Sequence, residues 1–282
     1  MKKVMCSIFF LVNLLYAQSY DLYNMVKHEY DFAEQAKIGT TRDAFLSFID
    51  DEGIIFRPHP VNGKTFLEKS KPNNGWLIWY PERAGISSSG DIGYTTGPAS
   101  FRKEKGDTAD IWYGNFCTVW RKQKDNSWKF LIDFGISNEK PVVTKKSLQV
   151  DANISSSASP VTPLGNKIFV KQFEGKFDRS QSEERSKSYF IDSRLLIDGF
   201  QPIDGDESIR MFFSKNVSDY ALYSVMEGGI SSANDFIYAY GTVKYTDASS
   251  KAEKENYYLR VWQKQSDDWK IMIEVWNEKP KE

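Results

Sequence analysis

The chain carries the same phrase twice, and this repetition constrains its fold more than any other feature. Residues 85–97 read GISSSGDIGYTTG and residues 229–241 read GISSANDFIYAYG, with seven of thirteen positions identical. Three further pairs keep the same order, namely PVNG at 60–63 with PIDG at 202–205, VWRKQKDNSWKFLID at 119–133 with VWQKQSDDWKIMIE at 261–274, and NEKP at 138–141 with NEKP at 277–280. The chain is therefore interpreted as one domain of roughly 115–125 residues present twice, since solenoid repeats are far shorter.

The repetition sets the domain boundaries that we expect. Residues 20–141 form copy 1, residues 167–280 form copy 2, and residues 142–166 connect them. The connecting segment, VVTKKSLQVDANISSSASPVTPLGN, is rich in Ser and poor in large apolar residues, which is typical of a linker. A short strand at its start is compatible with this sequence.

Residues 1–17 have the composition of a secretory signal peptide. A positive start, MKK, precedes the apolar stretch VMCSIFFLVNLLYA, whose 14 residues are short for a membrane span. Cleavage near Ala17 predicts an exported bacterial protein, periplasmic or extracellular, without membrane contact after cleavage; a retained anchor is the alternative. Cys117 is then the one cysteine of the mature chain, and we expect it to be a small buried hydrophobe.

Each copy has the same predicted order of elements, with helices first and antiparallel strands after them. In copy 1, apolar spacing and turn residues predict helices over 20–37, 40–50 and 63–70, and strands over 53–58, 76–89, 92–103, 110–123 and 127–137. The matching segments of copy 2 are 167–178, 182–193, 194–198, 205–214, 219–232, 235–246, 254–265 and 268–276. This order is that of an α+β fold.

The order of elements and the phrases FRPHPVNG, SSSGDIGYTTGP and TVWRKQKDNSWKFLID resemble the nuclear transport factor 2-like superfamily. This cystatin-like α+β fold includes ketosteroid isomerases and SnoaL-like polyketide cyclases, and copy 1 is most similar to exported bacterial members of unassigned function. The resemblance covers about 240 of the 282 residues. It implies two tandem cone-shaped domains, each with helices packed against a curved, mainly antiparallel sheet and a pocket between them.

The resemblance also implies that the open faces of such sheets can pair. The two copies would then form a pseudo-dimer within one chain, or the chain would form homo-oligomers. The superfamily contains enzymes, binding modules and inert scaffolds, so the resemblance does not fix the activity.

No catalytic set of the isomerases can be matched residue by residue in this sequence. It has no HExxH, CxxC, phosphate-loop or GxSxG motif, and its two histidines and one mature cysteine cannot supply a typical zinc site. We therefore expect no metal and no cofactor. A net charge of −1 without a basic stripe argues against nucleic acid as a partner.

His59 and Tyr94 are the candidates for acid–base chemistry. His59 lies between two prolines after the first strand, and histidine is the residue type best suited to acid–base chemistry at neutral pH; the alternative is an ordinary loop histidine. Tyr94 is in mid-strand and can either donate its hydroxyl group into a cavity or pack in a core. Copy 2 has Gln201 in place of His59 and Tyr238 in place of Tyr94.

The candidates for ligand binding are cationic or aromatic side chains of copy 1, namely Arg57, His59, Trp76, Trp79, Tyr80 and Tyr94. Copy 2 has Gly199 in place of Arg57 and the tryptophan-free segment YALYSV in place of the Trp group. Arg57 can hold an anionic group or lie ion-paired at the surface. The aromatic residues can line an apolar pocket or cover a sheet–sheet interface.

Asp133 and Glu274 hold the same place on the last strand of each copy. Strict alternation along a strand groups Asp133 with Lys129 and separates it from Trp128 and Ile132. Because a lysine predicts a wet face, Asp133 is interpreted as a solvated carboxylate.

These observations predict an exported tandem-domain protein that binds a small, largely apolar molecule or serves as an interaction module, without catalysis. One alternative is an acid–base enzyme of the isomerase or cyclase type with its site in copy 1 only. Another is a structural pseudo-dimer. The side chains that line a cavity in copy 1 would discriminate between these alternatives.

Overall fold

The computed structural model describes residues 2–141, 147–151, 167–178, 185, 187–218, 221–266 and 268–280, with side chains from residue 18 onward. Its helices are α1 (Lys2–Ile38), α2 (Thr41–Phe48), α3 (Gly63–Lys69), α4 (Lys167–Asp178) and α6 (Asp206–Asn216). The strands of the first half are β1 (Ile49–Phe56), β2 (Pro60–Asn62), β3 (Trp76–Trp79), β4 (Arg83–Ile86), β5 (Ile92–Arg102), β6 (Trp112–Lys122), β7 (Trp128–Ser137) and β8 (Gln149–Val150). Those of the second half are β9 (Tyr189–Ile197), β10 (Ile203–Asp204), β11 (Leu222–Ile230), β12 (Phe236–Thr246), β13 (Glu253–Gln265) and β14 (Asp268–Glu278).

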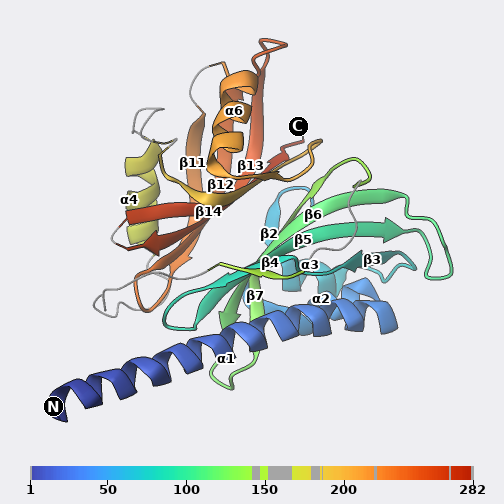
Figure 1. Ribbon diagram of the computed structural model, residues 1–282. Coiled ribbons are helices and arrows are strands. Elements are labelled where there is room, and N and C mark those ends of the chain that lie inside the picture. The colour runs from blue at the N-terminus through green and yellow to red at the C-terminus, as the bar shows by residue number, and fades with distance from the viewer. Residues whose placement is uncertain are drawn as a thin grey trace.

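The strands form two curved sheets, one in each half, and the predicted α+β class is confirmed (Figure 1). The first sheet has the order β2-β1-β7-β6-β5-β4-β8, with β3 also paired to β5, and the second has the order β10-β9-β14-β13-β12-β11. Most neighbours are antiparallel, whereas β1 and β7, β9 and β14, and β4 and β8 pair in parallel. The central order of strands is therefore the same in both sheets.

The sequence-based boundaries hold for most elements and fail at two. The strand predicted over 76–89 is divided into β3 and β4 around Pro81, whose ring nitrogen carries no hydrogen for a ladder bond. The segment 182–193 of copy 2 matches a helix in the alignment, but residues 189–193 belong to β9. Residues 182–184 and 186 of that segment lie outside the described residues, as do 142–146 and 152–166 of the predicted linker.

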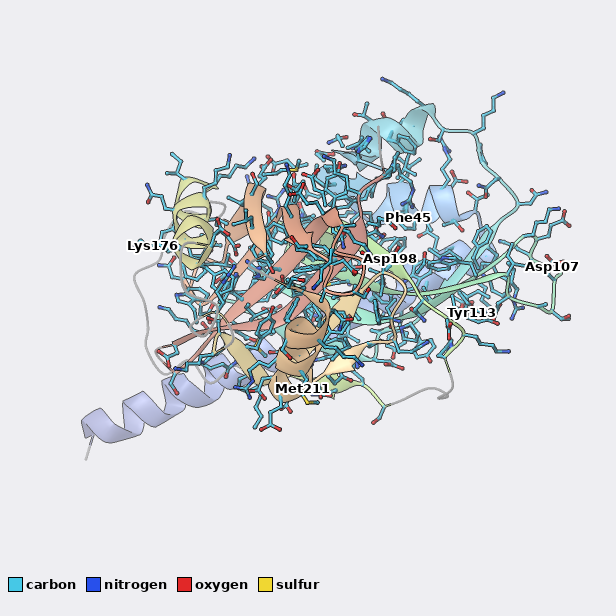
Figure 2. All side chains as sticks on the ribbon, turned by 90° about the horizontal axis from the view of Figure 1, so that it is seen from above. Phe45, Asp107, Tyr113, Lys176, Asp198 and Met211 are labelled. Carbon is cyan, nitrogen blue, oxygen red and sulfur yellow. The ribbon has the colours of Figure 1, made fainter. Side chains whose placement is uncertain are left out.

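Each sheet has helices on one face and the other sheet on its opposite face. Helices α1 and α2 cover the first sheet, and α4 and α6 lie on the outer face of the second (Figure 1). Between the sheets lies one shared apolar core, to which β5, β6 and β7 contribute together with β12, β13 and β14. In the view from above, Lys176 on α4 and Asp107 beyond β5 lie on opposite sides of the molecule (Figure 2).

The repeated phrase forms the β4–β5 corner in the first half and the β11–β12 corner in the second, and the two corners bind one another. Asp235 Oδ2 accepts a hydrogen bond from the backbone amide of Ser88 at 2.8 Å, and Asp91 Oδ2 accepts one from Ser232 at 2.9 Å. Each aspartate also accepts a bond from the first serine of its own corner. Such reciprocal capping satisfies backbone donors of both turns.

A described part of the predicted linker is ordered against both halves. Strand β8 pairs with β4, and the following Asp151 accepts two bonds of 2.8 Å from the Arg83 guanidinium group. Arg83 also donates to the backbone oxygen of Asp192 in the second half, and the Tyr94 hydroxyl group donates to Asp151. Burial is the main cause that raises the pKa of Asp151 to about 6, against the opposing effect of Arg83.

Within the described part of the chain, no helix combines the length and apolar character needed to cross a membrane.

Candidate functional site

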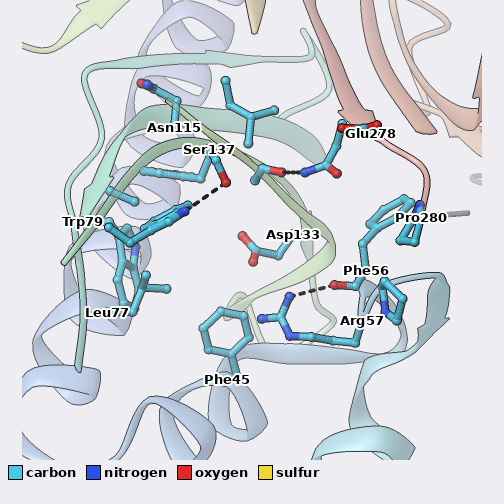
Figure 3. Close-up of a pocket in the computed structure, with 17 residues that line it drawn as sticks. Phe45, Phe56, Arg57, Leu77, Trp79, Asn115, Asp133, Ser137, Glu278 and Pro280 are labelled. Atoms are coloured by element: carbon cyan, nitrogen blue, oxygen red, sulfur yellow. Dashed lines mark hydrogen bonds between the residues drawn. The ribbon is translucent and has the colours of Figure 1, made fainter. Parts of the chain in front are cut away.

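A cavity of about 270 Å³ opens between the helices and the first sheet. Its walls are mainly aromatic and apolar near α2 and β3 and more polar along β6 and β7 (Figure 3). The lining residues from the first half include Phe45, Arg57, Trp79, Trp112, Asn115, Phe116, Asp133, Gly135 and Ser137. A concave site with an apolar wall and a few convergent polar groups is typical of small-molecule binding.

Asp133 lies at the centre of these residues with its carboxyl group in the cavity (Figure 3). The alternation expected from the sequence is wrong here, because β7 contains a bulge. Val119 pairs with Ile132 and Trp120 with Phe130, so that Leu131 is an extra residue and every later side chain changes face. Asp133 therefore points to the helix side of the sheet, and its interpretation as a solvated carboxylate on a wet face is corrected.

Burial is the main cause that raises the pKa of Asp133 above its ordinary value. The positive charge of Arg57 and the hydrogen bond from Thr118 oppose this shift only in part. Thr118 Oγ1 donates to Asp133 Oδ1 at 3.0 Å, and within the described residues the carboxyl group forms no ion pair. A half-buried carboxyl group in a cavity with a raised pKa is suited to bind a donor or to exchange a proton.

A second buried carboxyl group, Glu29 of α1, lies behind the cavity wall. It accepts hydrogen bonds from Trp79 Nε1 at 2.6 Å, from Thr95 Oγ1 at 2.5 Å and from Trp120 Nε1 at 3.1 Å. Burial nevertheless raises the pKa of Glu29 to about 7, and the negative charge of Asp133 contributes in the same direction. These bonds fix the Trp79 indole, which forms part of the cavity wall.

The rim of the cavity is built by both halves of the chain. Arg57 follows β1, and its guanidinium group donates to the backbone oxygen of Phe56 at 2.8 Å. Asn277 of β14 donates from Nδ2 to the backbone oxygen of Gly135 at 2.6 Å, and Glu278 and Pro280 continue the rim beside it. The packing of the second half on the first therefore shapes the entrance.

The equivalent region of the second half has a smaller cavity, of about 120 Å³, which Trp276 lines and which Glu274 does not. Its β14 has the same bulge, with Met272 as the extra residue, and Glu274 consequently points inward as Asp133 does. Arg260 donates to Glu274 at 2.9 Å and to Glu174 at 2.6 Å, and Trp276 Nε1 donates to Glu274 at 2.8 Å. All four of these side chains are at most 2 % exposed.

Two differences between the halves account for this contrast. Thr118 and Arg260 face Asp133 and Glu274 directly across the strand pair, and Gly135 and Trp276 occupy matching positions beside Phe116 and Tyr258. The first half has the short side chain at both positions, so its carboxyl group borders a cavity. The second half has the long one at both, so its carboxyl group is enclosed and paired.

Of the side chains singled out in the sequence, Arg57 and Trp79 line the cavity. Trp76 stacks under the Arg102 guanidinium group at 5.2 Å, and neither it nor Tyr80 is part of the lining. His59 is exposed beyond the cavity and shares a hydrogen bond of 2.7 Å with the Tyr257 hydroxyl group of the second half. Tyr94 is fully buried in the core between the sheets and does not reach the cavity.

The central residue of the cavity, Asp133, was noted in the sequence but assigned to the wrong face, and the lining residues Phe45, Trp112, Asn115 and Phe116 were not singled out. The alignment of the two copies could have indicated the site, because it places the short residues Thr118 and Gly135 of copy 1 at the positions of Arg260 and Trp276 in copy 2. Among the described residues, no group of three or more His, Cys, Asp or Glu side chains could hold a metal ion.

No protein-family model and no curated protein matches the sequence. The solved structures to which the chain is similar include nuclear transport factor 2-like, cystatin-like and ketosteroid isomerase-like proteins. A Nostoc punctiforme protein of unknown function with a cystatin-like fold shares 13% identity, and the match covers 38% of this chain and 84% of that one at a TM-score of 0.30.

A ketosteroid isomerase-like protein from Erwinia carotovora shares 13% identity over 40% of this chain and 96% of that one, at a TM-score of 0.32. A nuclear transport factor 2-like protein of unknown function from Shewanella oneidensis shares 14% identity over 37% of this chain and 89% of that one, at a TM-score of 0.30. At these identities and scores, the similarities carry no information about the activity of this chain.

Proposed function

We propose that the chain is a tandem pair of nuclear transport factor 2-like domains whose first domain binds a small molecule with a largely apolar body. The observation that carries this proposal is the contrast between the halves. The first has a cavity of about 270 Å³ that reaches a half-buried carboxyl group, whereas the cavity of the second is about 120 Å³ and its matching carboxyl group, Glu274, is enclosed by side chains. Aromatic walls with a few fixed polar groups support binding of a small molecule.

The second domain acts in this proposal as a closed structural partner. The shared apolar core, the reciprocal corner bonds of Asp91 and Asp235 and the rim residues Asn277 and Glu278 support an internal pseudo-dimer. In such a pair the second domain contributes stability and the entrance of the cavity, and the first domain contributes the ligand contacts.

A Gly135→Trp variant tests the proposal by introducing the side chain that covers Glu274 in the second half. A Cβ added at Gly135 meets only the backbone oxygen of Asn115 within 4 Å, at an ordinary 3.5 Å, so the backbone tolerates a side chain there. Gly106→Trp is the matched control, because a Cβ at Gly106 meets nothing within 4 Å.

The measurement is a fragment screen by saturation-transfer NMR on the wild type and both variants. We expect fragments that bind the wild type and Gly106→Trp but not Gly135→Trp. If no fragment distinguishes Gly135→Trp from the wild type, the cavity is not a binding site and the proposal fails.

A second candidate function, acid–base catalysis in the first domain, is favoured by one observation: Asp133 lies in the cavity with its pKa raised by burial. A general acid or base works best when its pKa lies near the working pH. Turnover of any bound carbonyl compound that disappears in Asp133→Asn, while binding persists, would support this function. Binding without turnover in the wild type would support a binding module.

We further propose that residues 1–17 direct export, on the strength of their positive start and short apolar stretch. Expression in a bacterial host followed by mass spectrometry of the periplasmic fraction tests this. The expected chain begins after Ala17, and a chain that keeps Met1 in the cytosol would contradict export.

A further inference from the structure

In the second half, the inward carboxyl group of Glu274 is bound by side chains of the same chain, and these show which groups such a carboxyl group can bind. Glu274 accepts bonds from the Arg260 guanidinium group, from the indole Nε1 of Trp276 and from the hydroxyl groups of Tyr189 and Tyr223. The guanidinium carbon lies 4.1 Å from the ring centroid of Tyr223, with Phe177, Tyr258 and Trp262 at 4.5, 5.1 and 5.6 Å. A cation and an aromatic N–H donor thus satisfy this carboxyl group inside an aromatic cage.

The first half keeps the carboxyl group and the aromatic walls but not these donors. Trp79 and Phe116 hold the places of Tyr223 and Tyr258, and Asp133 holds the place of Glu274. Glu274 accepts hydrogen bonds from four side chains. Among the described side chains, only Thr118 donates a hydrogen bond to Asp133. Asp133 is half-buried and Thr118 leaves part of its hydrogen-bonding capacity unused, so a donor in the cavity would find an acceptor there.

The charges around the cavity also favour a cation at Asp133. Glu278 lines the cavity together with Asp133, so an anion in the cavity would meet two carboxyl groups. Arg57 is the opposing charge in the lining, but its side chain is exposed to solvent and donates to the backbone oxygen of Phe56. An exposed charge is screened by solvent and salt, whereas a charge within the cavity is screened much less.

We infer that the ligand of the first domain is a small organic cation with a ring: a protonated amine or amidine binds Asp133, and the ring lies against Trp79 and Phe116 where Trp276 fills the second half. This inference rests on the proposed function and names the chemical class of its ligand. The cavity volume of about 270 Å³ suits one ring system with a short side chain.

Three probes that share the indole ring of Trp276 test the charge preference. Tryptamine is cationic, tryptophol is neutral and indole-3-acetate is anionic at about pH 7.5. Calorimetry should show that the full chain binds tryptamine at least about tenfold more tightly than tryptophol, as expected for a close charge pair in a partly desolvated site. Indole-3-acetate should bind most weakly.

Asp133→Asn removes the charge and keeps the shape, so it should bring the affinities for tryptamine and tryptophol to within about twofold. Asp51→Asn is the matched control, since Asp51 is an exposed partner of Lys64 and is not a lining residue of the cavity, and it should leave the tenfold preference unchanged. Circular dichroism of each variant verifies the fold. The inference is overturned if the wild type has no preference for tryptamine, or if Asp133→Asn retains the preference.

The outcomes also separate this inference from the proposed function. Equal binding of tryptamine and tryptophol that Gly135→Trp abolishes would overturn the cationic class and leave the binding function standing. Preferred binding of indole-3-acetate would assign the site to anions held by Arg57 and would overturn the inference. If none of the three probes binds, the inference fails, and the fragment screen decides the binding function independently.

Discussion

Replacing Arg260 by Met should destabilise the protein strongly, because Arg260 holds two buried carboxyl groups together. Its side chain is 0 % exposed, and it lies 2.6 Å from Glu174 and 2.9 Å from Glu274, which are 2 % and 0 % exposed. At an effective dielectric constant of about 20, each of these pairs attracts by about 6 kcal/mol before desolvation is subtracted. Removing one partner of a buried ion pair typically costs about 3–5 kcal/mol, and we expect a loss of that size.

The loss should depend on pH in a defined direction. Burial acts to raise the pKa of Glu274, but the Arg260 charge and the bonds from Arg260, Tyr189 and Tyr223 outweigh it and hold that pKa below its ordinary value. A carboxyl group with a lowered folded-state pKa contributes stability above its unfolded-state pKa and loses it as the pH falls through the folded value. Without Arg260, burial raises the pKa of Glu274, so the variant should regain stability as the pH falls.

Urea unfolding followed by tryptophan fluorescence, at about pH 7.5 and about pH 4.5, measures this difference. The gap between the wild type and Arg260→Met should be about 3–5 kcal/mol at the higher pH and smaller at the lower. Arg260→Lys keeps the charge but not the two-sided fork, so it should lose less.

Arg210→Met provides the control in the same half, because Arg210 pairs with Asp206 on the surface of α6 with side-chain exposures of 40% and 24%. It should change stability by no more than about 0.5 kcal/mol. A loss in Arg260→Met below about 1 kcal/mol, or one that does not shrink in acid, would refute the role assigned to the buried pair.

Two further predictions concern the contact between the halves. Asp235→Ala removes the charge-assisted bonds from Ser88 and Ser231 and should lower the free energy of unfolding in urea by about 2–4 kcal/mol. The control Asp125→Ala removes only bonds within an exposed turn and should lower it by about 1 kcal/mol. Equal losses in the two variants would contradict the corner contact. Cys117 is fully buried between the sheets, and burial raises the pKa of its thiol. Maleimide should therefore react with Cys117 only after unfolding, which peptide-level mass spectrometry can detect. Rapid labelling of the native chain would show instead that the shared core opens.

Local signals in the sequence predicted most of the secondary structure. The repeated phrase is a strand–turn–strand corner in both halves, as the Gly and Asp residues of each copy indicate. The division of the strand at Pro81 could also have been read from the sequence, because a proline lacks the N–H that a ladder requires. These features depend on neighbouring residues, so they are visible without the tertiary fold.

The candidate site could be predicted only in part. The alignment located the differences between the copies, and it placed Asp133 opposite Glu274 on the last strand. It could not reveal the bulge at Leu131, since the extra residue is defined only by pairing with β6. One residue of register exchanges the two faces of a strand, which is why Asp133 was assigned to solvent.

The sequence by itself determined that the chain contains related halves of α+β type, because repetition and periodicity are properties of the residue order. The tertiary structure decided where single side chains lie. Tyr94 is enclosed because the two sheets pack face to face, and Asp133 borders a cavity because Thr118 and Gly135 are short. The register of β7 depends on its pairing with β6, and the burial of Tyr94 depends on strands of the second half. No local pattern encodes which side chains another element will bring to a given position.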